Sequence, residues 1–193
     1  MALSPFNICQ GPATLYTGAF GTTEPADSAV ASVPGAGWTD VGIIADGTAV
    51  LMEMDLTYGD QGADQLVDPV GARLTKRTIQ VTASLAEATL ANMQIALNQL
   101  ATIGVNTGYS TLDPLTTGSS TQPTYTALII DGWAPTLSTG AAARRRIIVR
   151  KTLTASKLAL EYEKSKAAVF ACTFSAYYVS ASIGLFHVVD ATA

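Results

Sequence analysis

The stretch that determines the fold is residues 50–85, which read VLMEMDLTYGDQGADQLVDPVGARLTKRTIQVTASL. Apolar side chains take every second position from Val50 to Tyr58, and Glu53 and Asp55 lie between them. A period of two is that of a β-strand, and one apolar face with one carboxylate face is typical of a half-buried antiparallel strand. A second alternating segment runs from Arg73 to Leu85. The two segments predict a hairpin whose long loop spans residues 59–71.

The residues after this hairpin predict one α-helix over about residues 85–100. Ser84 is expected to cap it, and Glu87, three positions later, completes a capping box. Apolar residues recur at helical spacing as far as Leu100. A loop rich in Thr, Ser and Gly is expected over residues 104–123.

The rest of the chain predicts further strands and one loop-rich arm. Residues 1–37, with many Gly, Pro and Ala, are expected to form an N-terminal arm and extended loop. Residues 38–193 are expected to form a single domain. Its remaining strands are predicted at 38–44, 125–133, 145–153, 168–178 and 183–189. The fold class is therefore α+β and mainly β: an antiparallel sandwich-like or barrel-like body with one flanking helix and long loops.

The composition predicts a protein whose surface is covered. Of its 193 residues only 13% are charged, against about 25% in an average soluble domain, and 48% are hydrophobic. Two classes remain: a membrane protein, or a subunit buried by its neighbours. The uncharged stretch 167–189 is long enough to cross a bilayer. Its apolar residues alternate in a strand period, however, so we expect no membrane insertion of the monomer.

Charge and cysteine content exclude other classes. The net charge of −4 argues against a polyanion-binding protein for the chain as a whole. The apolar content is too high for disorder. The N-terminus lacks the pattern of a secretory signal, so Cys9 and Cys172 are expected to be free thiols in a reducing cytoplasm.

No constellation of residues predicts catalysis, and we expect no enzyme, no metal and no cofactor. The single histidine, His187, lies in an apolar strand, where a packed core or interface residue is expected. Glu53 and Asp55 are spaced for a general acid–base pair, but a solvated strand face is the better interpretation. Asp60, Asp64 and Asp68 do not have the spacing of a calcium-binding loop.

The basic run around residues 144–151 is the strongest positive feature. Arg144, Arg145, Arg146, Arg150 and Lys151 are five of the eleven cations. Nucleic-acid contact is one interpretation, but no aromatic stacking residues accompany the run. We expect these charges to pair with acidic neighbours in the same subunit or the next.

The order of these motifs resembles the major tail tube protein of long-tailed bacteriophages. The resemblance is carried by Gln65-x-x-Asp68-Pro69 in the acidic loop, Arg77-Thr78-Ile79-x-Val81 in the second strand, and residues 85–92, LAEATLAN. Upstream, residues 37–42, GWTDVG, precede Asp46-Gly47. The order of elements matches over residues 13–189, and the residue-level similarity is concentrated in 37–98. No family motif is recognisable in the 104–123 loop.

The resemblance implies a structural virion protein. Such subunits form hexameric rings that stack into a hollow tube, each giving strands to a continuous inner β-barrel. The tube conducts DNA into the host without binding it specifically. The implied partners are further copies of the chain, the tape measure protein, and the tail terminator and distal tail proteins. The implied location is the virion tail, after synthesis in the bacterial cytoplasm.

Three sets of residues receive expected roles from this resemblance. Glu53 and Asp55 are expected to line the lumen, where carboxylates repel phosphates. Residues of the long loop are expected to bridge rings, and its acidic members are Asp60, Asp64 and Asp68. Salt bridges between subunits are expected at Arg144, Arg146 and Arg150.

Two other functions remain open at this point. One is the secreted tube of a type VI-like system, and the other is a head decoration or other virion structural protein. An enzyme using Glu53 and Asp55 is the third and most distant alternative.

Overall fold

The computed structural model describes residues 8–62, 68, 70–115, 122–135, 142–154, 157–164 and 167–192. Within them the fold is mainly β, with antiparallel pairing throughout and one α-helix, α1 (Leu90–Ala96). The strands are β1 (Thr14–Ala19), β2 (Trp38–Asp40), β3 (Leu51–Gln61), β4 (Gly71–Leu85), β5 (Ala101–Asn106), β6 (Tyr109–Pro114), β7 (Thr126–Ala134), β8 (Ala143–Thr154), β9 (Phe170–Ala176) and β10 (Phe186–Asp190). The predicted fold class is confirmed.

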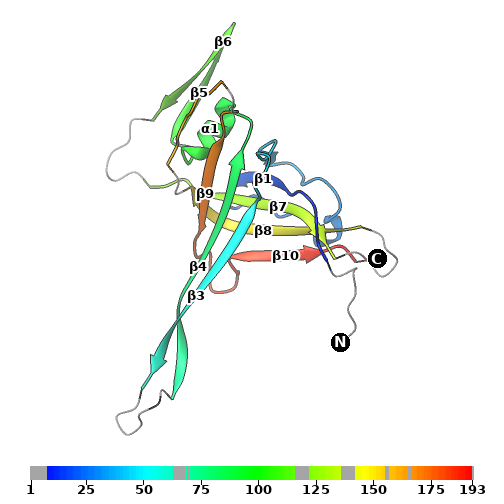
Figure 1. Cartoon of the computed structure of the whole chain (residues 1–193), viewed down its shortest axis with the longest axis vertical. Coiled ribbons are helices and arrows are strands. Elements are labelled where there is room, and N and C mark those ends of the chain that lie inside the picture. Colours follow the sequence, from blue (N-terminus) through cyan, green and yellow to red (C-terminus); the bar gives the residue numbers. More distant parts are fainter. Residues whose placement is uncertain are drawn as a thin grey trace.

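One eight-stranded sheet forms the body, in the order β2-β1-β7-β8-β9-β4-β3, with β10 also paired to β8. β8 is the corner of this sheet. Its residues 145–149 pair with β10, whereas its residues 152–154 pair with β9. Figure 1 shows the result: β1, β7, β8 and β10 lie across the molecule, while β3, β4 and β9 run along it. The sheet thus folds over itself as a sandwich and is not a closed barrel.

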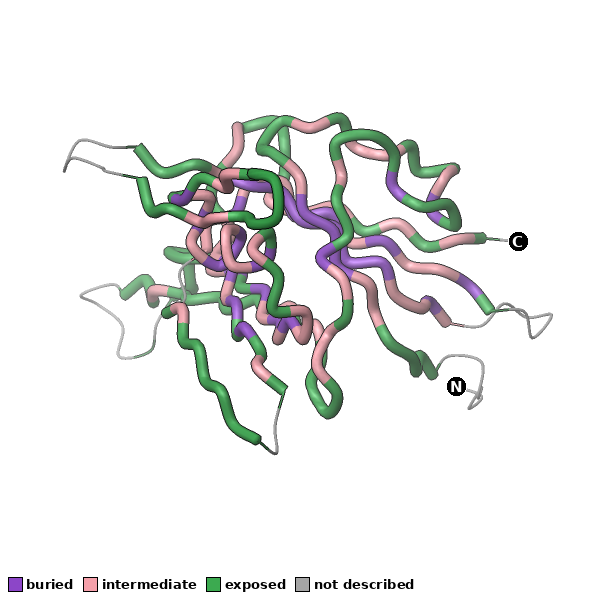
Figure 2. The backbone as a smooth tube through the Cα atoms, turned by 90° about the horizontal axis from the view of Figure 1, so that it is seen from above, coloured by how far each residue is buried: buried purple, intermediate pink, exposed green. Residues whose placement is uncertain are grey.

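The main core lies between these two sets of strands. In β4 the residues Ile79, Val81, Ala83 and Leu85 are buried, in the alternation that the sequence predicts. β9, beside β4, contributes Phe170 and Phe174, and the crossing strands contribute Leu15, Leu128 and Val149. Figure 2 shows the buried residues gathered where the strands cross and exposed residues at the projecting ends. Burying apolar side chains from both layers supplies most of the favourable free energy of such a fold.

The prediction that residues 1–37 form an arm is wrong for β1. This strand pairs with β7 on one side and β2 on the other, and Leu15 is fully buried. We call residues 20–37 the strap, because they leave β1 and return to β2 across the outer face of the body. Beneath the strap, Tyr16, Ile129 and Ile148 form a second apolar cluster against Trp38. Short apolar segments in a Gly/Pro-rich context can therefore be core strands when partners distant in sequence complete them.

The predicted helix is shorter than expected and begins later. β4 continues through Leu85, so Ser84 is a strand residue and caps nothing. Thr89 is the N-cap, and its hydroxyl accepts a hydrogen bond from the Asn92 amide at 3.1 Å. Glu87 instead accepts a hydrogen bond from the Ile43 amide at 3.0 Å. Both Ser84 and Thr89 satisfy the sequence rule for a cap, and the pairing of β4 with β9 decides between them.

The predicted loop over residues 104–123 is wrong in its first half. β5 and β6 form a separate two-stranded sheet across a turn at Gly108. Figure 1 shows this hairpin projecting at the end of the molecule opposite the tip of β3 and β4. Its residues alternate too weakly in hydrophobicity to give a strand signal, because most of them are exposed.

The boundaries of other strands differ from the predicted ones by a few residues. The predicted strand 38–44 is paired as a strand only at β2, while β3 and β4 extend into the predicted loop 59–71. The uncharged stretch 167–189 forms β9 and β10, as its strand period predicts. Among the described residues, no helix has the length and apolar content needed to cross a bilayer.

Candidate functional site

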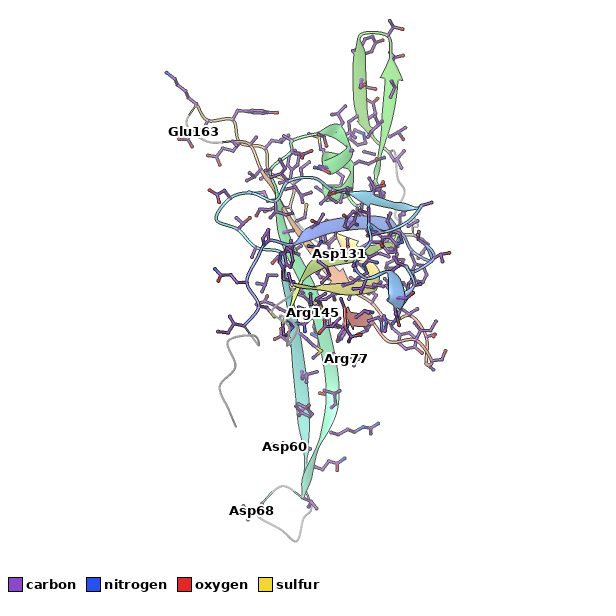
Figure 3. The ribbon with its side chains drawn as sticks, turned by 90° about the vertical axis from the view of Figure 1, so that its right-hand side faces the viewer. Asp60, Asp68, Arg77, Asp131, Arg145 and Glu163 are labelled. Carbon is purple, nitrogen blue, oxygen red and sulfur yellow. The ribbon has the colours of Figure 1, made fainter. Side chains whose placement is uncertain are left out.

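The most distinctive surface is the outer half of the β3–β4 hairpin, which we call the ribbon: residues 51–61 of β3 with 71–79 of β4. β9 pairs with β4 only at residues 80–85, so the ribbon is two-stranded from the pair Met54 and Ile79 to its tip. Figure 3 shows it extending well beyond the body, with Asp60 and Asp68 at its far end. β3 ends the strand order of the sheet. In the described chain, therefore, both long edges of the ribbon carry backbone groups that no neighbouring strand pairs.

One face of the ribbon is mostly apolar, although it also carries Arg77, opposite Leu56, and Asp60 near the tip. Residues directly opposite in the register share a face, and the pairs on this face include Met54 with Ile79 and Tyr58 with Leu74. Near the body the face is covered, and Ile79 is 0% exposed. Met54, directly opposite Ile79, is already 46% exposed, and Leu56, Tyr58 and Leu74 further out are each more than 40% exposed. The apolar alternation is confirmed, but the side it was expected to bury is open to solvent over the outer half.

The opposite face of the ribbon is polar and carries both signs of charge. Glu53 lies opposite Gln80 and Asp55 opposite Thr78. Lys76 lies opposite Thr57 on the same face, and Arg73, beyond a β-bulge, lies opposite Gly59. All four charged residues are exposed. Two carboxylates and two cations balance, so this face is charge-mixed and not simply acidic.

Glu53 and Asp55 are both exposed. The five main hollows of the described chain are lined by other residues, so neither carboxylate lies in an enclosed site of the kind that general acid–base catalysis uses. No group of three or more His, Cys, Asp or Glu side chains within the described ranges is placed to hold a metal ion. The geometry provides no support for acid–base chemistry at this pair.

The structure describes two of the three aspartates that were assigned to the hairpin loop. Asp60 is exposed in β3, opposite Ala72. Asp68 is exposed at the tip. Asp64 lies outside the described residues. The two described aspartates thus stand at the most distant point of the ribbon (Figure 3).

Arg146, predicted to bridge subunits, is instead fixed inside the chain. It is 1% exposed and binds Asp131 through two hydrogen bonds of 2.7 Å each. Its remaining donors reach the carbonyls of Ala29 at 3.2 Å and Ser32 at 2.5 Å. The guanidinium therefore joins β8, β7 and the strap, and the expectation of an inter-subunit bridge is wrong for this residue.

Arg150 is also used within the chain. It forms a two-point pair with Glu24 of the strap, at 2.5 and 3.0 Å, and donates to the Gly184 carbonyl at 2.9 Å. Arg144 lies over the ring of Trp133, 4.7 Å from its centroid. Arg150 thus has an acidic partner within its own chain, and a bridge to another subunit stays a prediction. Arg144 has a cation–π partner in its own chain.

Two further pairs complete this network. Arg145 binds Asp190 through two hydrogen bonds of 2.6 Å, which lower the pKa of the Asp190 carboxyl. His187 contacts Asp27 of the strap at 3.1 Å and is half-exposed, so it is not a core residue. The acidic partners lie as far as 160 positions away in sequence, and no local pattern could have identified them.

A hollow of about 300 Å³ lies under the strap, beside Phe20, Trp38 and Ile148. Its charged residues, Glu24 and Arg150, already bind each other. Because its two charged residues are paired with each other, the hollow gives no indication of a charged ligand.

Comparisons with known proteins assign no relationship. A scan against protein-family models finds no match, and a search of curated proteins finds no significant similarity.

The sequence thus identified the ribbon's polar and apolar positions but not their exposure. The missing signal is three-dimensional: β9 ends its pairing with β4 at Gln80, and nothing in the residues of β4 marks that point.

Proposed function

We propose that this chain is a structural subunit that polymerises into a hollow tube, of the kind formed by the major tail tube proteins of long-tailed bacteriophages. The observation that carries the proposal is the ribbon, with two unpaired edges and an exposed apolar face. An isolated two-stranded hairpin is marginally stable in water, and long open edges invite pairing with another chain. Neighbouring copies of the chain would pair with both open edges and cover the apolar face at the same time.

A ring of ribbons accounts for these features. Closing several ribbons into a barrel removes every edge, and each apolar face then packs on the bodies of the surrounding subunits. The polar faces line the lumen, with Glu53 and Asp55 among the lining residues. Lys76 and Arg73 on the same face make the lining charge-balanced, so DNA meets neither strong repulsion nor a basic track that would retain it.

The ribbon tip supplies the contact between rings in this proposal. Asp60 and Asp68 stand furthest from the body, and the tip of one subunit can reach the next ring. Stacking would also explain why so few charges suffice for a 193-residue chain, since interface cores are depleted in charge. The further partners are the tape measure protein inside the tube and the proteins that end it, and the location is the virion tail.

Negative-stain electron microscopy of the purified protein over a range of concentrations tests the proposal. Stacked hollow tubes are the expected result. Rings that never stack would favour the secreted tube of a type VI-like system, and co-purification with capsids instead of tails would favour a decoration protein. A monomer that persists at high concentration contradicts polymerisation.

An enzymatic role is tested separately. The double substitution Glu53→Gln with Asp55→Asn preserves the size of both side chains and removes their charge. We expect it to fold and, at sufficient protein concentration, to form rings. A turnover of the wild-type protein that this variant loses while it remains folded would contradict a purely structural role.

A further inference from the structure

The ionic interactions of this chain divide into two groups. On the body, Arg145, Arg146, Arg150 and His187 each contact an acidic side chain. On the ribbon, none of the four charged residues on the polar face has an ion-pair partner among the described residues. The arginines of the body therefore have ion-pair partners within the chain, whereas the charged residues of the ribbon's polar face have none among the described residues.

The unpaired charges are sorted by strand. Both carboxylates, Glu53 and Asp55, are on β3, and both cations, Arg73 and Lys76, are on β4. Across the hairpin each carboxylate faces a neutral residue, Gln80 or Thr78, and the cations lie nearer the tip. The ribbon therefore has one acidic edge and one basic edge, and no carboxylate of the polar face lies directly opposite a cation of its own hairpin.

We propose that these two edges are a self-complementary pair of docking surfaces: the β3 edge of one copy binds the β4 edge of the next, with Glu53 and Asp55 paired with Lys76 and Arg73 of its neighbour. This inference rests on the proposed function, since it specifies how copies meet in the ring. Copies related by rotation point their ribbons the same way, so β3 and the neighbouring β4 run antiparallel, as strands in this sheet already do.

Charge decides between the two ways in which identical ribbons can meet. A two-fold contact would place β3 against β3 or β4 against β4, which sets like charges side by side. A head-to-tail contact sets acids against cations at every junction. Heterologous contacts close into rings when the rotation between neighbours closes, and like-charge repulsion against the two-fold alternative supplies the specificity.

The contact also fixes a stagger between neighbours. Within the chain Asp55 is level with Thr78, whereas pairing with Lys76 or Arg73 of the neighbour requires a shift toward the tip. A closed barrel needs such a stagger between its strands. The positions of the four charges and the geometry of closure therefore point to the same arrangement.

Two charge-reversed variants test the inference. Variant one carries Glu53→Lys and Asp55→Lys, so both edges are basic. Variant two carries Arg73→Glu and Lys76→Glu, so both edges are acidic. We expect each variant alone to assemble poorly. Like charges at every junction should weaken the affinity between neighbours about tenfold or more, so the protein concentration required for rings should rise by at least that factor. Circular dichroism and urea unfolding of the dilute monomers establish that both fold.

Mixing the two variants is the decisive step. In an alternating ring every junction again brings opposite charges together, so the equimolar mixture should assemble near the wild-type concentration, as should one chain carrying all four reversals. A pairing inside one ribbon would be restored in the four-fold variant but not in the mixture. Asp113→Lys, an exposed reversal outside the ribbon, is the control and should assemble like wild type.

The outcomes separate the two proposals. Tubes from both variants alone, or no recovery in the mixture, would overturn the edge pairing while the tube assignment stands on the wild type. A wild-type protein that remains monomeric would overturn the tube assignment and the edge pairing with it.

Discussion

Two neighbouring arginines on β8 have opposite environments. Arg146 and its partner Asp131 have side chains only 2% and 6% exposed, whereas those of Arg145 and Asp190 are 35% and 38% exposed. A buried charge that loses its partner stays desolvated without compensation. A surface pair is screened by water and contributes little.

We therefore expect Asp131→Ala to reduce the free energy of unfolding by about 3–5 kcal/mol. Asp190→Ala is the matched control, with an expected loss of at most about 1 kcal/mol. Urea denaturation of the monomeric protein measures both. Equal losses for the two variants would contradict the role assigned to burial.

The two cysteines should differ in reactivity. Cys9 is exposed, while Cys172 is buried in the core and its burial raises the pKa of the thiol from 9.0 to about 11. The neutral thiol favours the folded state up to about pH 9, and that contribution is lost as the pH rises through about 11. At pH 8 a disulfide reagent should modify one thiol rapidly and the second only in denaturant. Two rapid equivalents would show that Cys172 is accessible.

At the scale of elements, α1 depends on its cap. It is only seven residues long, and helices this short are not stable on their own. The Thr89 hydroxyl satisfies the Asn92 amide, and Asn92 itself is buried and donates to the carbonyls of Val41 and Glu87. The start of the helix is thereby attached to the body.

Removing this cap gives a prediction that also checks the corrected helix boundary. Thr89→Ala should reduce the free energy of unfolding by about 0.5–2 kcal/mol. Ser84→Ala, at the cap position that the sequence suggested, should stay within about 0.5 kcal/mol of wild type. Thermal or urea unfolding compares them. A larger loss at Ser84 than at Thr89 would restore the longer helix.

At the scale of the whole molecule, the exposed apolar face of the ribbon allows the proposed assembly to be tested separately from folding. Leu56 and Tyr58 are 42% and 57% exposed, so replacing both with Gln should leave the unfolding free energy of the monomer within about 0.5 kcal/mol for each site. Assembly should weaken about tenfold or more, because burying such side chains contributes over 1 kcal/mol each. Sedimentation velocity across a concentration series measures this.

The control for the ribbon face is Tyr162→Gln. Tyr162 is 83% exposed and lies outside the ribbon, so its replacement should change neither quantity. Unchanged assembly in the Leu56 and Tyr58 variant would show that this face is not an interface.

The sequence by itself determined the strand pattern. A period of two in residues 50–58 and 73–85 depends only on which side of a pleated chain each residue occupies, and the hairpin and mainly β fold class follow from it. The alternation also identified Glu53 and Asp55 as members of one exposed polar face. These are local properties, which each segment carries whatever it packs against.

Only the tertiary structure decided which faces and charges find partners. β1 is a core strand because β7 and β2 flank it, Arg146 is an internal anchor because Asp131 and the strap meet there, and the ribbon is exposed because β9 stops at Gln80. Burial and ion pairing are sums over residues brought together from distant parts of the chain. The pattern in residues 50–85 therefore specifies an apolar face, and the arrangement of the other strands determines that half of this face remains open for another molecule.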